Sequence, residues 1–177
     1  MQLTGKQIVE FADKGIIFNT CPEGIQQQGV DVRLKDVFVF CDIPYPVMGK
    51  ITKEKSHIPQ TKSTNGTAMW TKKGDSEFIV LEPGYYEVMF EEGCKLPNNM
   101  AMYFKTRSSL VRCGAIIHSG QFDGGFETQN MGAFLQVIRP IEIERGARIA
   151  QAIVSETYVV DEDHMYNGQW QNDNQRA

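Results

Sequence analysis

The alternation of apolar and polar residues predicts a chain built mainly from β-strands. In GVDVRLKDVFVF (29–40), valine and leucine occupy every second position as far as Leu34, and the alternation restarts one residue out of step at Val37. A period of two is the spacing of side chains on one face of a strand. We therefore predict a long strand with a bulge or turn near Lys35 and Asp36.

Further short apolar runs, separated by glycine and proline, predict many more strands. Pro83 and Gly84 mark a turn between two of these runs. Ile149, Ala152 and Val154 do not alternate cleanly, so we expect their strand to be buried on both faces. Many short strands with such turns predict a sandwich, jelly roll or closed barrel. The runs lie within 77–97, 98–106, 114–120, 132–140, 141–146 and 147–160.

One segment near the N-terminus has helical spacing. Within residues 3–15, Ile8, Val9 and Phe11 supply an apolar face, and Gly15 is the expected C-terminal stop. We predict no other helix.

Two segments are too polar for a core. Residues 42–76 have few apolar pairs and many turn residues, which predicts a long surface excursion. Residues 161–177 form a polar tail that nevertheless contains Tyr166 and Trp170, so we expect it to lie over a neighbouring surface or to act as a lid. The whole chain, residues 1–177, is expected to form a single domain of this kind.

Charge and composition narrow the class of protein. The 177 residues have a net charge of −4 and a pI of about 5.4, which argues against binding to nucleic acid or to an anionic membrane. The start of the sequence lacks the features of a signal peptide, and no stretch approaches the roughly 20 apolar residues of a membrane span. The four scattered cysteines are expected to be reduced, and the cytoplasm is the expected location.

Several catalytic motifs are missing from the sequence. It has no P-loop, no G-x-G-x-x-G after a strand, no H-E-x-x-H, no zinc-deaminase signature and no G-x-S-x-G. We therefore expect neither covalent catalysis nor a metal ion held by protein ligands.

Three short stretches offer candidate chemistry. In TRSSL (106–110), a guanidinium and two hydroxyls can converge on a phosphate, although by itself the stretch is better explained by a turn after a strand with Arg107 in a surface ion pair. In FDGGF (122–126), Asp123 can take a proton from water or bond a sugar hydroxyl, or it can cap an Asx-turn. In ERGARIAQ (144–151), Arg148 and Gln151 need polar partners, from an anionic ligand or a neighbouring subunit.

These stretches, taken in order, resemble the dUTPase and dCTP deaminase superfamily. The resemblance implies a jelly-roll-like, distorted β-barrel that assembles as a homotrimer with active sites at subunit interfaces. It runs from near residue 3 to residue 171, and only the segment 42–76 lacks a counterpart. The matching stretches are LTGKQIVEFADKGII (3–17), GVDVRL (29–34), TRSSLVRCG (106–114), GQFDGGF (120–126), GARIAQ (146–151) and YNGQWQ (166–171).

The resemblance also implies a role for each matching residue. Asp123 would orient and activate a water, and Phe126 would pack on the deoxyribose. Asp31 would fix the surroundings of the site, through a water of a Mg²⁺ ion that the triphosphate itself holds. Phosphates would be bound by Arg107, Ser108, Ser109, Arg148 and Gln151, and the tail would close over them with Tyr166, Gln169 and Gln171. Arg112 is implied to reach the base or a phosphate, or to pair across the trimer.

The sequence departs from the deaminase branch at its key acid. That branch needs a glutamate on the strand after the hairpin, and the two possible alignments place Ala133, or else Gln136 or Val137, there. None of these is an acid, and Glu127 belongs to the turn. The hairpin before Asp123 is slightly short, Thr128 stands where a glycine is usual, and YNGQWQ replaces the glycine-rich tail of typical trimeric dUTPases.

We therefore predict a dUTP diphosphatase, a hydrolase that converts dUTP to dUMP and pyrophosphate with Mg²⁺. Two alternatives stay open. One is dCTP deamination, alone or combined with hydrolysis, and the other is a nucleotide-binding trimer without catalysis.

Overall fold

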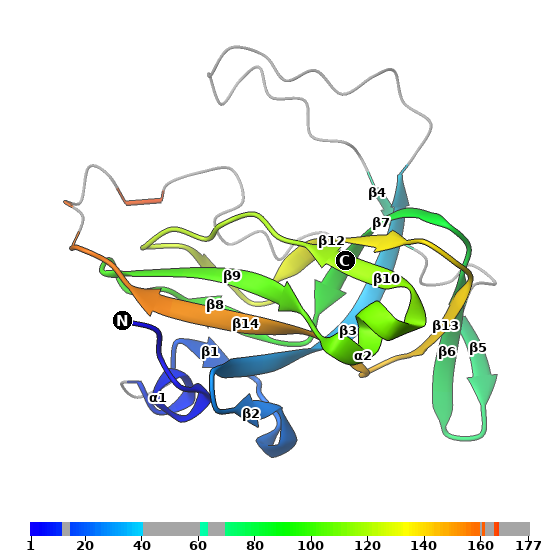
Figure 1. The fold of residues 1–177 in the computed structure, drawn as a ribbon, viewed down its shortest axis with the longest axis horizontal. Helices are drawn as coiled ribbons and strands as arrows, with labels where there is room; N and C mark the ends of the chain where they lie inside the picture. The colour runs from blue at the N-terminus through cyan, green and yellow to red at the C-terminus, as the bar shows by residue number, and fades with distance from the viewer. Residues whose placement is uncertain (12–14, 41–60, 64–69, 160, 162–164, 167–177) are drawn as a thin grey trace, which may run out of the picture.

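The computed structural model describes residues 1–11, 15–40, 61–63, 70–159, 161, 165 and 166. The fold is mainly β, as predicted, and its largest sheet is a nearly closed barrel (Figure 1). This sheet has the order β10-β12-β7-β3-β14-β9, with β2 and β4 paired to β3. Its strands are β2 (Ile25–Gln26), β3 (Gly29–Phe40), β4 (Thr61–Ser63), β7 (Gly84–Phe90), β9 (Met100–Thr106), β10 (Ala115–His118), β12 (Gly132–Val137) and β14 (Arg148–Glu156).

Two three-stranded sheets complete the described β structure. One has the order β1-β8-β11 and lies near the N-terminal helix, and the other has the order β13-β6-β5. Strands β4 and β5 lie inside the polar segment 42–76, of which residues 42–60 and 64–69 are outside the described residues. The strands are β1 (Ile17–Phe18), β5 (Trp70–Lys73), β6 (Ser76–Leu81), β8 (Gly93–Lys95), β11 (Glu127–Thr128) and β13 (Ile141–Glu144).

The bulge predicted in the long strand is present. In β3, Leu34 pairs with Phe90 and Asp36 pairs with Met89, so Lys35 is an extra residue in the ladder. The extra residue lets the apolar alternation restart, which keeps both Leu34 and Val37 fully buried.

The helices differ from the prediction. Helix α1 spans Gly5–Glu10 and therefore ends well before Gly15. At its start, Thr4 forms a capping box with Gln7. A second helix, α2 (Ser108–Cys113), was missed, and a short 3-10 helix, η1 (Pro22–Gly24), precedes β2. Helix α2 occupies the stretch in which we predicted only a turn after a strand.

Side chains close the gap between the two edge strands of the barrel. Thr106 Oγ1 donates to the carbonyl of Ile117 at 3.1 Å and accepts from its N–H at 2.9 Å. Ser119 Oγ accepts from the N–H of Phe104 at 2.9 Å. These bonds satisfy the backbone groups that a continuous ladder would otherwise pair.

The described cysteines are free, as the sequence predicts. Cys21, Cys94 and Cys113 form no disulfide, while Cys41 lies outside the described residues. Burial raises the pKa of the Cys94 thiol to about 12, which makes it unreactive. In the part of the chain that the structure describes, no helix is long and apolar enough to cross a membrane.

Candidate active site

A cavity of about 420 Å³ opens where the loop of residues 119–131 meets the sheet. Its volume is within the range of small-molecule sites. Most of its wall is apolar, with a few carboxylate, amide and imidazole groups. The lining residues are Phe38, Glu87, Val88, Met89, His118, Gly120, Gln121, Phe122, Asp123, Phe126, Thr128, Asn130, Met131, Gly132, Ala133, Phe134 and Tyr166.

Asp123 lies on a tight turn at this cavity. The N–H of Phe126 donates to the Asp123 carbonyl at 3.1 Å, and Gly125 has a φ of 90°, a conformation that favours glycine. The carboxylate is exposed, and its Oδ1 accepts a bond from Gln121 Nε2 at 3.2 Å. No donor among the described residues bonds Oδ2, so this oxygen can accept a hydrogen bond from water.

A row of aromatic rings anchors this turn to the core. Neighbouring ring centroids along the row lie 4.8–5.2 Å apart, in edge or tilted contacts. Such pairs add roughly 0.5–1.5 kcal/mol each beyond the area that they bury. The turn that holds Asp123 is therefore rigidly supported. The rings are those of Phe90, Phe104, Phe122, Phe126 and Tyr166.

The tail reaches the cavity at Tyr166. The Tyr166 N–H donates to the Gly124 carbonyl at 3.0 Å, and the ring contacts Phe126. A Cβ on Gly125 would lie 2.8 Å from the Met165 methyl carbon, so the tail packs closely on the turn. Gln169 and Gln171, also predicted here, lie outside the described residues.

A second group of predicted residues, which we call the arginine cluster, forms around Asp31. It comprises Asp31, Arg107, Arg148 and Gln151. The Asp31 side chain is 2% exposed, and its Oδ2 lies 3.1 Å from Arg107 Nε and 3.4 Å from Arg148 Nη1. Gln151 Nε2 donates to Oδ1 at 3.3 Å. Burial raises the pKa of Asp31, while the two arginines and Gln151 act in the opposite direction.

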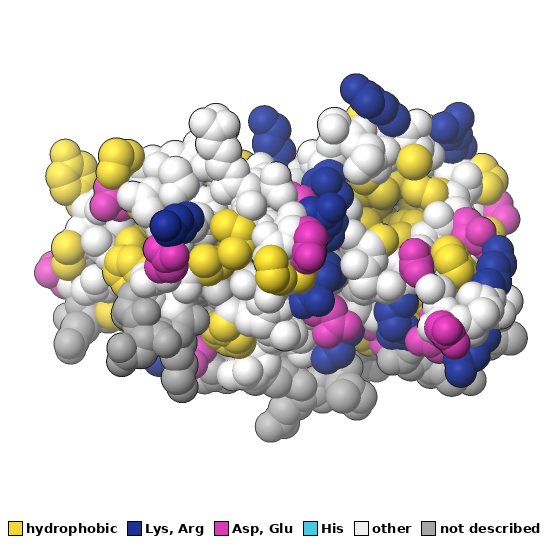
Figure 2. Space-filling model, turned by 90° about the horizontal axis from the view of Figure 1, so that it is seen from below, with side chains coloured by type: hydrophobic (Ala, Val, Ile, Leu, Met, Phe, Trp, Pro, Cys, Tyr) yellow, Lys and Arg dark blue, Asp and Glu magenta, His cyan; other side chains and the backbone are white. Residues whose placement is uncertain are grey.

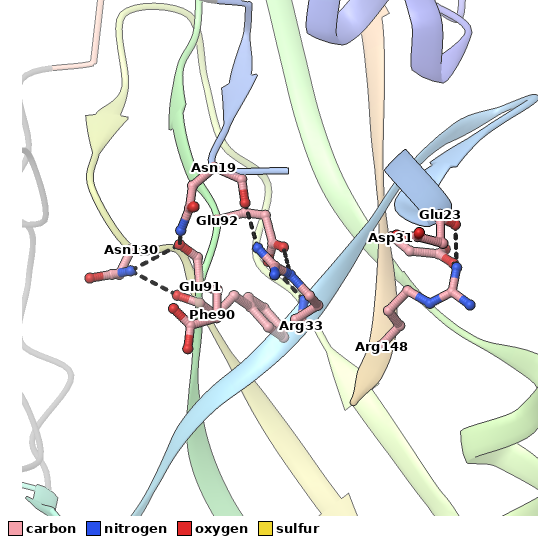
Figure 3. Close-up of polar contacts among 9 residues, drawn as sticks. All are labelled: Asn19, Glu23, Asp31, Arg33, Phe90, Glu91, Glu92, Asn130 and Arg148. Carbon is pink, nitrogen blue, oxygen red and sulfur yellow. Dashed lines mark hydrogen bonds and ion pairs between the residues drawn. The ribbon is translucent and has the colours of Figure 1, made fainter. Parts of the chain in front are cut away.

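Both arginines of this cluster are held on more than one side. Arg107 Nη1 donates to the Arg148 carbonyl at 2.9 Å, and Arg148 Nη1 also donates to the Glu23 carbonyl (Figure 3). Their side chains remain about one-third exposed, at 30% and 32%. The guanidinium groups are thus oriented but still accessible to an anion.

The remaining phosphate-binding candidates lie on helix α2. Ser108, Ser109 and Arg112 are exposed there. None of these three residues, and no member of the arginine cluster, lines the cavity. Within one chain, the structure therefore divides the predicted site into two places, one with Asp123, Phe126 and Tyr166, and the other with the arginine cluster and α2.

The structure describes every residue that was considered for the position of the deaminase glutamate. Ala133 lines the cavity, Val137 is buried in the core, and Gln136 bonds the ring of His118. Glu127 forms an ion pair with Lys95 at 3.0 Å and does not line the cavity. No acid therefore occupies any of the aligned positions.

Two cavity residues were not singled out as site residues from the sequence. Glu87 lies on β7, where it is the cross-strand neighbour of Phe134. From the sequence, His118 could either contact the base or be a polar residue at a strand end, and the second alternative was favoured. A polar residue in an apolar run such as GYYEVMF was the available signal for Glu87, but the pattern does not say which face of the sheet borders a cavity.

A buried ion pair supports the loop from behind. Glu92 is fully buried and accepts bonds from Arg33 Nε at 2.6 Å and from the Arg33 N–H at 2.7 Å. The Glu92 carbonyl in turn accepts from the N–H of Met131 at 2.9 Å, at the end of the loop. Asn130 Nδ2 bonds the neighbouring carbonyls of Phe90 and Glu91 (Figure 3). This network fixes the wall of the cavity at residues 130 and 131.

Charges of both signs share one face of the molecule. On the face seen in Figure 2, Lys and Arg side chains gather near the centre with Asp and Glu side chains directly beside them. This face is therefore not a uniformly basic surface of the kind that tracks a nucleic-acid backbone.

The described side chains offer no separate site for a metal ion. Over the described ranges, no group of three or more His, Cys, Asp or Glu side chains is placed to hold a metal. Asp31 is already engaged by two arginines. Mg²⁺ commonly binds through substrate phosphates with few protein carboxylates, and this arrangement is compatible with that mode.

Comparison with known proteins agrees with this fold. Residues 2–157 match the family model of dCTP deaminase-like proteins. The chain therefore belongs to the dCTP deaminase-like family, as the sequence motifs predicted.

The relatives bear the names of both branches of the superfamily. The chain is 34% identical over 143 residues to a deoxyuridine 5′-triphosphate nucleotidohydrolase of Methanocaldococcus jannaschii, covering 81% of this chain and 85% of that protein. It is 27% identical over 175 residues to a dCTP deaminase of Acidianus ambivalens, covering 97% and 92%. These relatives are named as enzymes of the dUTPase and dCTP deaminase group.

A solved structure supports the fold. The crystal structure of a 2′-deoxycytidine 5′-triphosphate deaminase from Agrobacterium tumefaciens matches with a TM-score of 0.58 at 19% identity. The match covers 86% of this chain but only 47% of that chain, so this protein spans about half of the longer one.

Proposed function

We propose that this protein hydrolyses dUTP to dUMP and pyrophosphate. One observation carries the proposal: Asp123 presents an exposed carboxylate at the cavity, while none of the positions aligned with the deaminase glutamate is acidic. The relatives named as dUTP nucleotidohydrolases support the same choice.

The reaction needs little from the protein beyond positioning and a base. Asp123 accepts a hydrogen bond from a water through Oδ2, while Gln121 steadies Oδ1. The water oxygen attacks the α-phosphorus, its proton passes to Asp123, and the bond from the α-phosphorus to the bridging oxygen breaks. Pyrophosphate leaves with that oxygen, and dUMP remains. A Mg²⁺ ion on the triphosphate would neutralise charge there.

The other cavity residues would position the nucleotide. The ring of Phe126 would pack against the deoxyribose, where a 2′-hydroxyl would clash. Tyr166 would cover this contact and exclude bulk water as the tail closes, together with Gln169 and Gln171. The close packing of Met165 and Tyr166 on the turn supports this role for the tail.

The separation of the two groups within one chain supports a shared site in a homotrimer. In this arrangement the cavity of one subunit would receive the arginine cluster of a neighbour. Arg107, Arg148, Gln151 and the α2 residues Ser108, Ser109 and Arg112 would then bind the triphosphate. We place this single-domain protein in the cytoplasm, with 42–76 as a polar excursion.

Product analysis tests the activity directly. Purified protein with Mg²⁺ is incubated with dUTP and with dCTP in parallel, and the nucleotides are separated. We expect dUMP and pyrophosphate from dUTP and no change in dCTP. An intact dUTP pool after complete incubation would refute the proposal.

One observation keeps the deaminase alternative in view. Glu87 is a second carboxylate on the cavity wall, on a different strand from the aligned glutamate. If dCTP is converted to dUTP or dUMP, and Glu87→Gln abolishes that conversion, deamination through Glu87 replaces the proposal. If neither nucleotide changes although both bind, the protein is a nucleotide-binding module.

A further inference from the structure

One wall of the cavity is a row of four side chains that crosses four neighbouring strands. His118 on β10 pairs with Phe134 on β12, which pairs with Glu87 on β7, which pairs with Phe38 on β3. All four line the cavity, and β10, β12 and β7 lie next to one another in Figure 1. Cross-strand neighbours are close enough for a ligand to touch adjacent members of such a row. His118 stands at the end of the row, where β10 enters the loop that holds Asp123.

The ring of His118 is held by a chain of two further side chains. His118 Nε2 lies 2.9 Å from Gln136 Oε1, and Gln136 Nε2 donates to the Tyr85 hydroxyl oxygen at 3.3 Å. In the structure, the Gln136 amide oxygen faces His118 and the amide nitrogen faces the Tyr85 hydroxyl, and an amide oxygen can only accept. Gln136 Oε1 must therefore accept from His118 Nε2–H.

This assignment fixes the character of the other ring nitrogen. In a neutral imidazole only one nitrogen carries hydrogen, so His118 Nδ1 is an acceptor. No described residue donates to Nδ1. His118 lines the cavity beside Phe134, which is 43% exposed and can stack on a planar base.

We propose that His118 determines base specificity by accepting a hydrogen bond from the N3–H of a uracil-type base. Uracil has a hydrogen at N3, whereas cytosine has a lone pair there. Cytosine would therefore place two acceptors face to face. The substrate class is a pyrimidine deoxynucleotide with a hydrogen on N3. This inference rests on the proposed function, because it places the base of the proposed nucleotide in this cavity.

Nucleotide monophosphates test this proposal without any need for turnover. The affinities of dUMP, 3-methyl-dUMP and dCMP are measured by calorimetry for the wild-type protein and for His118→Phe. We expect dUMP to bind the wild type at least about tenfold more tightly than the other two ligands. In His118→Phe, which keeps a ring at an exposed strand position, the three affinities should converge to within about threefold.

A second pair of variants tests the fixed orientation of the ring. Tyr85→Phe removes the acceptor for Gln136 Nε2, so the amide can rotate and the preference for dUMP should fall part of the way. Tyr103→Phe, an equally conservative change at an exposed tyrosine on β9 away from the cavity, should leave the preference unchanged.

Each outcome decides between separate claims. Equal binding of the three ligands to the wild type, no binding of dUMP, or a preference that survives in His118→Phe would overturn the role of His118. If the preference and its loss appear as expected but dUTP is not hydrolysed, His118 is confirmed as the base reader and the proposed hydrolase activity is wrong.

Discussion

Asp31 and Asp123 are two aspartates of the predicted site that lie in opposite surroundings. Asp31 is buried and contacts two arginines and a glutamine, whereas Asp123 is exposed and bonds one glutamine side chain. A carboxylate surrounded by donors is suited to orienting them, and a carboxylate that faces solvent is suited to binding water. The same residue type is therefore suited to two different purposes here, and the environment decides which.

The largest expected effect comes from neutralising the exposed aspartate. Asp123→Asn preserves shape but removes the base, so we expect dUTP turnover to fall about 10³-fold while nucleotide affinity stays within a few-fold. Pyrophosphate release and calorimetric titration measure the two quantities. Unchanged turnover would show that Asp123 is not the base, and that exposure does not give it a catalytic role that Asp31 lacks.

The second effect concerns stability rather than chemistry. Asp31→Ala leaves Arg107 and Arg148 without their shared carboxylate, and we expect the free energy of unfolding to fall by about 2 kcal/mol. This is less than the roughly 3–5 kcal/mol of a fully buried pair, because both arginines are partly exposed. Chemical denaturation measures this value.

A matched control separates burial from charge. Glu142 forms an exposed ion pair with Lys73, and Glu142→Ala should cost no more than about 0.5 kcal/mol. An equal loss in both variants would show that Asp31 is no more important to the fold than a surface carboxylate.

A third variant tests whether the Tyr166 ring contributes to substrate binding near Asp123. Tyr166→Ala removes the ring that contacts Phe126, so we expect KM for dUTP to rise about five- to tenfold with a smaller change in kcat. Tyr158 is 96% exposed and lies close by in sequence, so Tyr158→Ala is the control and should behave as wild type. Steady-state kinetics of the three proteins give the comparison, and parallel changes in both variants would deny Tyr166 a special role.

The smallest effect is a pH dependence of stability. Burial raises the pKa of Asp31 above its unfolded value of about 3.9, so the folded protein binds more protons than the unfolded chain just above that pH. The stabilising contribution of Asp31 is complete below the unfolded pKa and is lost as pH rises through the folded pKa. The free energy of unfolding of wild type minus that of Asp31→Asn should therefore decrease between pH 4 and pH 7.

Denaturation curves of both proteins at several pH values within this window provide the difference. The buried Glu92, whose pKa is also raised, is present in both proteins and cancels. A difference that grows with pH would mean that the arginines outweigh burial at Asp31.

Local patterns predicted most of the strands because their cause is local. The alternation in 29–40 predicted β3 and its bulge, since side-chain period reports directly which face is buried. Helix α2 was missed because six residues do not span enough turns to show a helical period. Helix α1 was predicted too long, because its end at Glu10 is not marked by a glycine.

The candidate site was only partly predictable for a related reason. Short motifs identified Asp123 and the residues around Asp31, but they did not show that these lie in two separate places of one chain. The bonds of Asp31 to Gln151 and of Arg33 to Glu92 join residues 120 and 59 positions apart. Strand order and register bring such distant residues into contact, and they also place Glu87 and His118 on the same wall of the cavity.

The extra residue in β3 makes chain length at this point more important than residue type. Lys35 is the unpaired residue, with its carbonyl bonded to Arg145 Nη1 at 2.5 Å and its Nζ bonded to Asn130 Oδ1 at 3.0 Å. Replacing it would remove one contact to the loop and leave the alternation intact. Deleting it would turn residues 36–39 to the opposite face of the sheet. A substitution at position 35 would therefore change one side chain, whereas a one-residue deletion would exchange the buried and exposed faces of the second half of the strand.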